Sequence, residues 1–509
     1  MVRFLTALLC VAAALITTAA PASAGAAAVA DGGFETGGGW RSTGTAGAAF
    51  TEPGGHSGSL RLTHHASGAY RVETAQALTR LADGPYTLRA WVRSGGGQRS
   101  VSVGLRDCGG DDARTELPVT PDWVEITVSA MVTRHRCTIS LFSGNLYSDA
   151  PAGAWANFDD VRLEPGAARL AIRGADVSSL AKSEAFGGVY RYADGRRGDA
   201  LAILRRGGLN YIRLKVWVNP ADGYNTKTQV LAIAKRAKAQ GLGLLVDFHY
   251  SDSWADPGKQ NKPAAWESLS FDELKQALYD HTYDVLSALK AQGTTADMVQ
   301  VGNELNGGLL WPDGRWDNWP QLAALLNAGY DAVKAVSGGT KVVLHLANGA
   351  DNGLYRWWFD NAAANGIRYD VIGLSYYPYW HGTLAAFQAN LFDVASRYGK
   401  PVVVAETAYP FTTADDDGWE NNVTSAEPYP GYPATPAGQA AFARDLMSIV
   451  RAVPGGRGLG AFYWEATWTG VKGNGWDPAD PASGNAWENQ ALFGFDDRAL
   501  PALRQFGRR

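Results

Sequence analysis

Two different patterns of hydrophobic and polar positions divide the chain. In the first third, hydrophobic and polar residues alternate one by one in short runs that are separated by glycine and polar turns. These runs are residues 58–64, 85–94, 100–107, 123–132, 137–144 and 156–164. Such alternation gives a β-strand one buried and one exposed face, and many short strands at this spacing are typical of an antiparallel sandwich. Residues 25–166 are therefore predicted to form an all-β sandwich domain.

After a linker at residues 164–170, hydrophobic runs typical of strands alternate with amphipathic helical stretches. The predicted strands are residues 172–178, 209–217, 243–250, 297–304, 341–348, 369–377, 401–409 and 459–466. Helical spacing of hydrophobic residues marks 226–241, 270–293, 319–336 and 437–453. Eight such units predict a (β/α)₈ TIM barrel for residues 167–509, because its strands are buried on both faces and read as continuous hydrophobic runs. An open doubly wound sheet is the alternative, but no glycine-rich dinucleotide turn follows the first strand.

The composition fits a two-domain globular protein and narrows the partners. The chain has 509 residues, of which 46% are hydrophobic and 60 are glycine, and its formal net charge is only −4. It has no basic run of the kind that nucleic-acid-binding proteins carry. We expect a monomer that acts on an uncharged molecule, with no nucleic-acid partner.

The first 24 residues have the pattern of a secretory signal peptide. Arg3 precedes a hydrophobic stretch, and the small residues Ala22-Ser23-Ala24 precede Gly25. The stretch is shorter than the about 20 residues that cross a bilayer, so a secreted, extracellular protein without a membrane partner is predicted. A lipid anchor is the less favoured alternative, because Cys10 lies inside the hydrophobic stretch and far from the cleavage site.

Removal of the signal peptide leaves two cysteines, Cys108 and Cys137, both in the predicted sandwich. An exported location favours a disulfide between them. Two buried free thiols are the alternative.

Two predicted barrel strands end in carboxylates. The fourth ends in Asn303 and Glu304, and the seventh ends in Glu406. Because an unpaired buried charge is costly, and because TIM-barrel chemistry lies at the carboxyl ends of the strands, both glutamates are expected in a polar mouth. Strands four and seven lie on opposite sides of the ring, so the two carboxylates would face each other. Such a pair can break a glycosidic bond, with retention at a separation of about 5–5.5 Å and inversion at about 6.5–9.5 Å.

Seven stretches, among them "VGNELNGGLLWP" (301–312) and "VVVAETAYPFT" (402–412), resemble glycoside hydrolase family 53, the endo-β-1,4-galactanases. The others are residues 210–220, 246–266, 373–384, 460–468 and 486–497. The resemblance extends over about residues 170–505 and includes all eight predicted strands in order. It implies a retaining glycosidase with Glu304 as acid/base and Glu406 as nucleophile, acting on galactan or type I arabinogalactan.

Further residues at the predicted mouth fit roles that this chemistry requires. They are Asn303, Arg213, Asp247, His249, Tyr376 and Trp464. Asn303 would hydrogen-bond the sugar 2-hydroxyl, and Arg213 would keep the nucleophile ionised. The remaining polar side chains would complete the hydrogen-bond network, with Trp464 as the floor of the central sugar site.

Several of these residues have a structural alternative. Arg213 would equally suit a salt bridge in the barrel core, His249 a core histidine, and Asp247 a turn cap. Tyr376 and Tyr377 must point in opposite directions along a strand, so only one of them lines the mouth. Glu465 also ends a predicted strand and would replace one of the catalytic pair if the strand register differed.

Many tryptophans of the second domain fall in loops after the predicted strands, which favours an aromatic groove for a polysaccharide chain and hence endo action. One such loop also contains Asp415, Asp417 and Asn421, which alternate like the oxygen ligands of a calcium ion. Bacterial members of glycoside hydrolase family 53 have a D-x-D-x-H-x-N run, and in this chain Trp419 occupies the position of the His. We expect no cofactor for the chemistry and a structural calcium at this loop, with a solvated acidic turn as the alternative.

The two ends of the predicted sandwich, "DGGFETGGGW" and "NFDDVRLE", resemble carbohydrate-binding modules of the galactose-binding-like jelly-roll type. That resemblance implies that Glu35 and Asp160 lie near a structural calcium. The alternative is that both are ordinary carboxylates in turns. A sugar platform could come from among Trp40, Tyr70, Trp91, Trp123, Tyr147 and Trp155. The sequence does not separate a platform from core residues.

The leading interpretation is a secreted endo-β-1,4-galactanase with an accessory carbohydrate-binding module. A β-mannanase or β-glucanase with the same retaining barrel is the alternative enzyme. A carbohydrate-binding surface protein with an inactive barrel is the alternative outside enzymes, and the presence of both glutamates argues against it.

Overall fold

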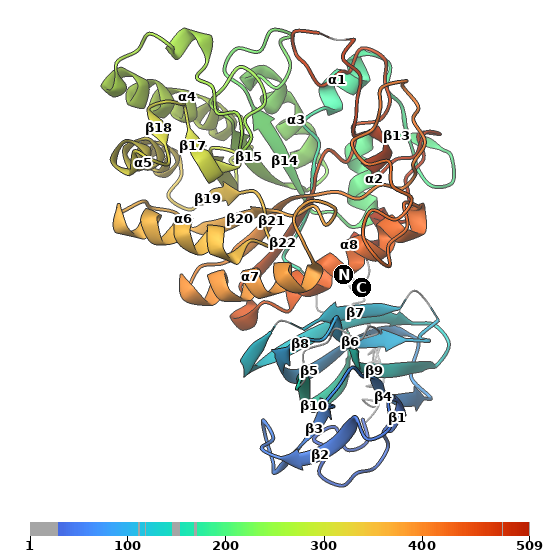
Figure 1. The fold of residues 1–509 in the computed structure, drawn as a ribbon. Coiled ribbons are helices and arrows are strands. Elements are labelled where there is room, and N and C mark those ends of the chain that lie inside the picture. The colour runs from blue at the N-terminus through green and yellow to red at the C-terminus, as the bar shows by residue number, and fades with distance from the viewer. Residues whose placement is uncertain are drawn as a thin grey trace, which may run out of the picture.

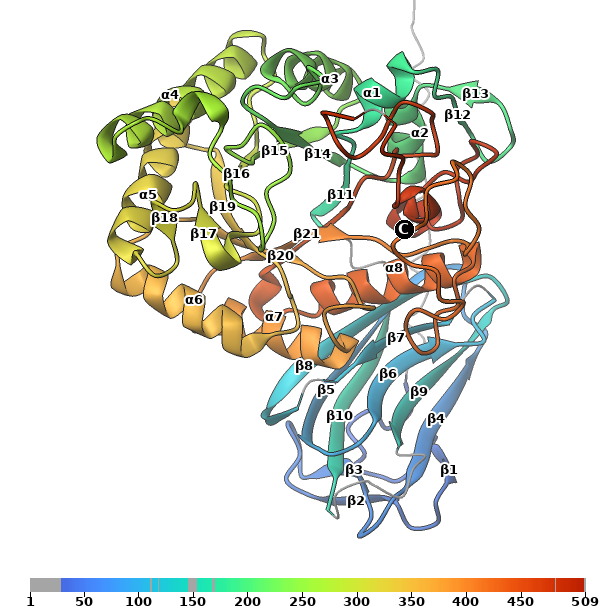
Figure 2. The same cartoon turned by 45° about the horizontal axis from the view of Figure 1, so that its top comes forward.

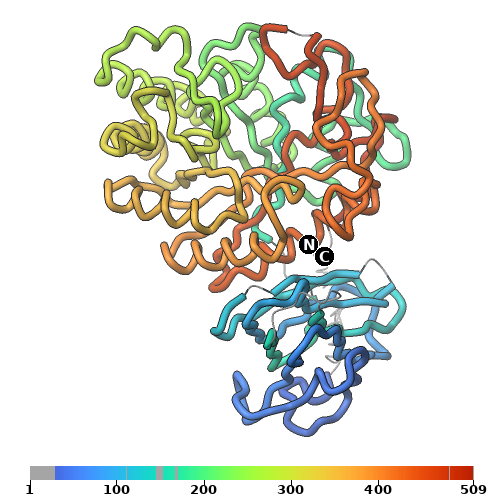
Figure 3. Tube along the Cα trace, viewed as in Figure 1, coloured from blue at the N-terminus to red at the C-terminus, as the bar shows by residue number. Residues whose placement is uncertain are grey.

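The computed structural model describes residues 29–109, 112–117, 119–144, 153–166, 170–480 and 482–507. The described chain forms a β-sandwich and a TIM barrel, and neither domain borrows a strand from the other (Figures 1 and 3). The predicted signal peptide and Tyr147 lie outside the described residues. Among the described helices, none is long and apolar enough to cross a membrane.

The N-terminal domain is an antiparallel sandwich of two five-stranded sheets, as predicted. One sheet has the order β1-β4-β9-β6-β7 and the other β2-β3-β10-β5-β8. The strands are β1 (Arg41–Gly44), β2 (Ala49–Pro53), β3 (Leu60–His65), β4 (Arg71–Thr79), β5 (Gly84–Gly96), β6 (Ser100–Arg106), β7 (Ala113–Glu116), β8 (Thr120–Val132), β9 (Arg136–Gly144) and β10 (Trp155–Pro165). Alternate residues such as Leu88, Val103 and Ile139 are fully buried between the sheets. The predicted disulfide between Cys108 and Cys137 is present.

The second domain is a closed barrel of eight parallel strands in chain order, which confirms the predicted TIM barrel (Figure 2). Its strands are β11 (Ile172–Asp176), β14 (Tyr211–Val216), β15 (Gly243–Phe248), β16 (Met298–Val301), β19 (Lys341–Leu346), β20 (Val371–Ser375), β21 (Val402–Thr407) and β22 (Gly458–Tyr463). The helices are α1 (Leu180–Ala185), α2 (Ala200–Gly207), α3 (Lys227–Ala239), α4 (Phe271–Ala291), α5 (Trp319–Val336), α6 (Asn352–Ala364), α7 (Leu384–Arg397), α8 (Pro436–Arg451) and α9 (Leu503–Gly507). Two small hairpins pair β12 (Tyr190–Arg191) with β13 (Arg197–Gly198) and β17 (Gly308–Leu309) with β18 (Gly314–Arg315).

The barrel interior changes from apolar to polar along the strands. One cluster of buried side chains fills the end where the strands begin; it consists of Ile172, Leu245, Met298, Val343, Val371, Val403 and Phe462. Two residues further along three of these strands stand Asp247, Gln300 and His345, all fully buried. Side chains alternate along a strand with a period of two, so residues two positions apart lie on the same face of the strand. The inner face of each of these strands therefore lines the apolar core where the strand begins and the polar site further along.

The sandwich packs against the side of the barrel (Figures 1 and 2). Strands β7 and β8 lie against helix α8, and β7 also contacts α7. Both helices flank β21, so the sandwich lies beside the part of the barrel that carries Glu406.

Candidate active site

Glu304 lies in a tight turn at the end of β16. The strand stops at Val301, three residues before the predicted end, and Gly302 has a φ of 89°. Glu304 itself is in the left-handed region with a φ of 47°, which costs a non-glycine residue on the order of 1 kcal/mol. Two neighbours fix the turn: the Gln260 amide donates to the Asn303 carbonyl at 2.8 Å, and the Trp358 indole donates to the Leu305 carbonyl at 2.8 Å. The turn therefore holds the Glu304 carboxylate over the barrel opening.

The surroundings of Glu304 favour its protonated form. Its carboxylate accepts a hydrogen bond of 2.6 Å from the Ser375 hydroxyl on the neighbouring β20, which lowers the pKa of Glu304, but two stronger effects act in the opposite direction. Burial and the nearby Glu406 carboxylate raise the pKa of Glu304 to about 8. A carboxyl group that keeps its proton near neutral pH can serve as a general acid.

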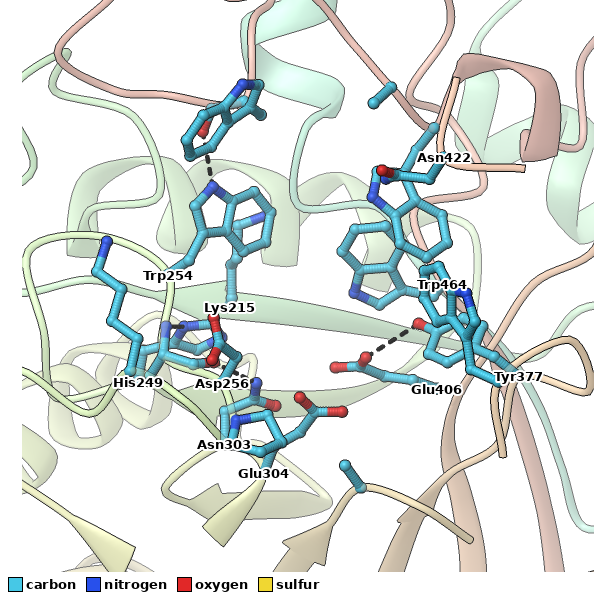
Figure 4. Close-up of a pocket in the computed structure, with 18 of the residues that line it drawn as sticks. Lys215, His249, Trp254, Asp256, Asn303, Glu304, Tyr377, Glu406, Asn422 and Trp464 are labelled. Atoms are coloured by element: carbon cyan, nitrogen blue, oxygen red, sulfur yellow. Dashed lines mark hydrogen bonds between the residues drawn. The ribbon is translucent and has the colours of Figure 1, made fainter. Parts of the chain in front are cut away.

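Glu406 on β21 faces Glu304 across the opening (Figure 4). Its carboxylate lies 2.7 Å from the Arg213 guanidinium and accepts a hydrogen bond of 3.1 Å from the Tyr377 hydroxyl. Burial raises the pKa of Glu406 to about 7, and the Arg213 cation acts in the opposite direction. Arg213 stabilises the ionised form of Glu406. Glu406 is therefore the first of the two glutamates to lose its proton as the pH rises, and Glu304 stays protonated.

Arg213 contacts carboxylates of both the barrel core and the site, as its two predicted roles would require. The guanidinium is 1% exposed and contacts Asp176 at 2.7 Å and Asp247 at 2.8 Å, in addition to Glu406. It also donates to the Asn303 side-chain oxygen at 2.9 Å. Burial alone would lower the pKa of Arg213, but the three carboxylates raise it, so the cation is permanent. This cation fixes the positions of Glu406 and Asn303 relative to each other.

Asp247 and His249 form a buried pair beside Arg213. The His249 Nε2 atom lies 3.0 Å from Asp247, and the backbone N–H of Ala255 donates to His249 Nδ1 at 3.0 Å. His249 therefore carries its proton on Nε2, and Arg213 with His249 overcomes the effect of burial to lower the pKa of Asp247. Asn303 and His249 both line the cavity at the mouth, whereas Asp247 lies beneath them.

Tyr377, and not the predicted Tyr376, is the tyrosine of the mouth. Ser375 points inward to Glu304, so the period of two turns Tyr376 outward and Tyr377 inward. Tyr376 is fully buried, stacks on Phe387 at 4.1 Å and donates to the Gly382 carbonyl. The assignment of Tyr376 to the site is therefore corrected to Tyr377.

Glu465 is excluded from the catalytic pair by its surroundings. Its carboxylate accepts hydrogen bonds from the Lys215 ammonium at 2.6 Å and from the Ser179 backbone at 3.1 Å. It is 2% exposed and does not reach the cavity, whereas Lys215 does. The strand register that places Glu304 and Glu406 opposite each other is thus the one observed.

A cavity of about 760 Å³ opens above the two glutamates and is lined mainly by aromatic rings. Its tryptophans are Trp254, Trp380, Trp419, Trp464, Trp468, Trp476 and Trp487. Trp464 lies near the glutamates (Figure 4). Trp380, Trp419 and Trp476 line the same cavity and are each about half exposed. Of the other loop tryptophans, Trp266 packs into the core, and Trp316 does not line the cavity. An open, aromatic groove of this kind suits a long sugar chain.

The sequence reasoning missed several residues that complete the site. Ser375, Lys215, Asp256 and His345 all contact or line it. The signal for Lys215 was present, because it lies two positions after Arg213 on one strand and must share its face. Ser375 and His345 were hidden inside hydrophobic runs, where single polar residues carry little information.

The predicted calcium loop gains a ligand from another part of the chain. Asp415 and Asp417 lie together with Glu488, their carboxylate oxygens within 4.8 Å of one another. The Glu488 Oε2 and Asn421 Oδ1 atoms are buried without a hydrogen-bond partner in the described structure. Carboxylate and amide oxygens are the ligands that Ca²⁺ prefers, and these two buried oxygens have no partner among the described residues, so the residues fit the ion. In the sandwich, by contrast, Glu35 accepts from the Ser59 and Leu60 backbones, and Asp160 pairs with His56.

A TIM barrel with two buried carboxylates facing each other below an aromatic groove defines a glycoside hydrolase. Residues 172–506 match the family model described as Glycosyl hydrolase family 53. The chain belongs to this family.

Several known proteins are similar to this chain. An endo-beta-1,4-galactanase of Bacillus subtilis (strain 168) is 39% identical over 369 residues, which cover 66% of this chain and 85% of the relative. A Niallia circulans protein named "Uncharacterized protein in bgaB 5'region" is 45% identical over 341 residues, covering 65% and 92% of the two chains. The solved Ignisphaera aggregans GH53 catalytic domain is 44% identical, covers 66% of this chain and 95% of its own, and superposes with a TM-score of 0.63.

Proposed function

We propose that this protein is a secreted, endo-acting, retaining β-1,4-galactanase that hydrolyses pectic galactan or type I arabinogalactan. The observation that carries the proposal is the asymmetry of the glutamate pair: burial and the nearby Glu406 carboxylate raise the pKa of Glu304, while Arg213 and Tyr377 stabilise Glu406 as an anion. The names of the similar galactanases support the choice of substrate. The hydrophobic leader at residues 1–24 supports secretion.

The chemistry proceeds in two steps. Glu304 gives its proton to the glycosidic oxygen as Glu406 bonds to the anomeric carbon and the carbon–oxygen bond to the leaving sugar breaks. Glu304, now a carboxylate, then takes a proton from water as the water oxygen attacks the same carbon and releases Glu406. Two inversions at one carbon leave the configuration unchanged. Arg213 and Tyr377 hold Glu406 in line during both steps, and one free amide hydrogen of Asn303 can reach the sugar 2-hydroxyl.

The substrate is tested with a panel of polysaccharides. Unbranched β-1,4-galactan should release reducing ends rapidly, with oligosaccharides of several lengths among the first products, because the groove is open at the rim. Mannan and β-glucan should release at least about a hundredfold less, since differences of 3 kcal/mol in transition-state binding are common for a mismatched hydroxyl. Equal or faster cleavage of mannan or glucan would assign the barrel to one of the alternative endoglycosidases.

We also propose a structural calcium ion at the loop site. Asp415, Asp417, Asn421 and Glu488 would hold it, and it would tie the loop after β21 to the segment around Glu488. A chelator should then lower Tm by a few degrees, because a ligand at 100 times its Kd stabilises by about 2.7 kcal/mol. Added Ca²⁺ should restore it.

Matched variants decide whether this effect comes from the loop site. The shift should vanish in Asp417→Asn and persist in Asp272→Asn, which removes an exposed carboxylate on α4. A chelator without effect on the wild-type Tm would reduce the site to a solvated acidic turn.

For the sandwich we propose carbohydrate binding on the sheet that contains β2, β3, β10, β5 and β8. A cavity of about 400 Å³ lies on this sheet and includes Phe50, Arg93 and Trp155. The buried Asn157 forms its polar floor and accepts from Arg93 at 2.9 Å, while the Arg93 guanidinium lies 4.7 Å from the centre of the Trp123 ring. Exposed rings beside oriented polar groups can stack on a sugar and hydrogen-bond its hydroxyls.

Affinity electrophoresis in galactan tests this face in a full-length, inactive Glu304→Gln background. Replacing Trp155 by alanine should weaken the retardation clearly, because the sandwich face then no longer contributes to binding. Trp316→Ala, which removes an exposed ring on the barrel, should leave it unchanged. Retardation in Trp155→Ala equal to that of the Glu304→Gln parent would show that this face does not bind the polysaccharide.

A further inference from the structure

The segment between β21 and α8, residues 408–435, is a long loop that reaches from the groove to the sandwich. It follows Glu406 directly, carries Trp419 of the groove and two carboxylates of the proposed calcium site, and contains no helix or extended strand. Loops of this length without secondary structure are uncommon in compact domains unless other contacts hold them in place.

One anchor of the segment is Tyr409, three residues after Glu406. Its ring is fully buried, and its backbone N–H donates to the Tyr463 hydroxyl at 3.0 Å. Its own hydroxyl donates to the carbonyl of Tyr432 and accepts from the backbone of Tyr429 at 3.1 Å. Tyr409 therefore connects the two ends of the segment, next to the nucleophile at one end and next to α8 at the other.

The far end of the segment meets the sandwich. The Arg114 guanidinium on β7 lies 5.9 Å from the centre of the Tyr432 ring. The adjoining turn also lies near Arg114, since a Cβ on Gly431 would lie 3.6 Å from an Arg114 nitrogen. The Tyr432 ring is 2% exposed, and its hydroxyl donates to Asp445 on α8 at 2.9 Å.

The charges at this contact are complementary. Arg114 comes from the sandwich, and Asp445 comes from the barrel helix against which β7 packs. Glu116, two residues along β7, lies 3.7 Å from Arg114 and accepts from Ser100 at 2.8 Å. Arginine beside an aromatic ring and a carboxylate is a typical anchor of a protein interface.

We propose that the sandwich clamps residues 408–435, and that Arg114 is a positioning residue that acts on the groove through Tyr432 and Tyr409. The sandwich then contributes to hydrolysis even of chains too short to reach its own proposed sugar site. This inference rests on the proposed function for its kinetic consequence, whereas the clamp itself is a property of the fold.

The test uses the full-length chain with Arg114→Met and the control Arg41→Met. Arg41 is exposed on β1, the opposite edge strand of the same sheet, so the two variants remove the same charge. On a short β-1,4-galacto-oligosaccharide, Arg114→Met should lower kcat/KM by about tenfold, mainly through a higher KM as Trp419 loses its fixed position. Arg41→Met should match the wild type.

Hydrogen exchange separates the clamp from the enzymatic proposal. Amides in residues 408–435 should exchange faster in Arg114→Met, and those in β15 should not. Tyr432→Phe removes only the hydroxyl that is bonded to Asp445, and should increase the exchange of the same amides by a smaller amount. This variant replaces Arg114→Met in the test if Arg114→Met does not fold. Unchanged exchange in this segment would overturn the clamp whatever the activity, whereas faster exchange in a protein that does not cleave galacto-oligosaccharides would leave the clamp and refute the proposed function.

Discussion

Glu406→Ala is expected to lower kcat/KM on β-1,4-galactan by about four orders of magnitude or more, the scale on which covalent catalysts lose activity without their nucleophile. The variant keeps Arg213, Asp247 and the groove, so substrate should still bind. Without the carboxylate, no group in the site can form the bond to the anomeric carbon. Reducing-end release over hours, compared with wild type at equal concentration of folded protein, measures the loss.

Azide provides the control for this variant. The small anion should enter the space left in Glu406→Ala or Glu406→Gly, attack the anomeric carbon from the face that Glu406 occupied, and yield an α-configured glycosyl azide. Glu406→Asp should not be rescued, because its carboxylate still occupies and charges that space. If neither truncated variant recovered activity with azide, Glu406 would lose its assignment as the nucleophile.

Glu304→Gln is the second change with a large expected effect. Glutamine keeps the shape of the side chain but has no acidic proton, so cleavage of galactan should fall by about 10²–10⁴-fold, the usual contribution of a general acid. An aryl galactoside with a good leaving group needs no proton on its leaving oxygen and should be affected far less. Comparison of kcat/KM for the two substrates measures the role directly.

The pH profile gives an independent check on Glu304. Wild-type kcat/KM should rise as Glu406 ionises and fall as Glu304 loses its proton, with the alkaline limb toward pH 8, because burial and Glu406 raise the pKa of Glu304 to about 8. Ser375→Ala should move that limb to higher pH, since the Ser375 hydroxyl lowers the pKa of Glu304. An alkaline limb that persists in Glu304→Gln, measured with the aryl substrate, would assign it to another group.

The fold could be predicted from the sequence because both domains have strong periodic signals. Each barrel strand is a continuous hydrophobic run, and its polar residues come at the end where a TIM barrel places its chemistry. Glu304, Glu406 and Arg213 were therefore identifiable from their positions on strands.

The parts that the sequence did not reveal depend on local geometry or on distant contacts. The choice between Tyr376 and Tyr377 depends on where β20 stops alternating, and one residue of uncertainty exchanges the two side chains. Glu488 reaches the Asp415 loop from 71 or more residues away, so no spacing motif contains it. Arg114 belongs to another domain, and its contact with Tyr432 follows from how the sandwich packs against α8.

The configuration of the first product tests the central claim most directly. Proton NMR recorded during the first minutes of β-1,4-galactan hydrolysis, before mutarotation, distinguishes the two anomers of the new reducing end. A retaining reaction through Glu406 predicts that the β-anomer appears first and the α-anomer only as mutarotation proceeds. Initial formation of the α-anomer would contradict the account, because it would require water rather than Glu406 to attack the anomeric carbon.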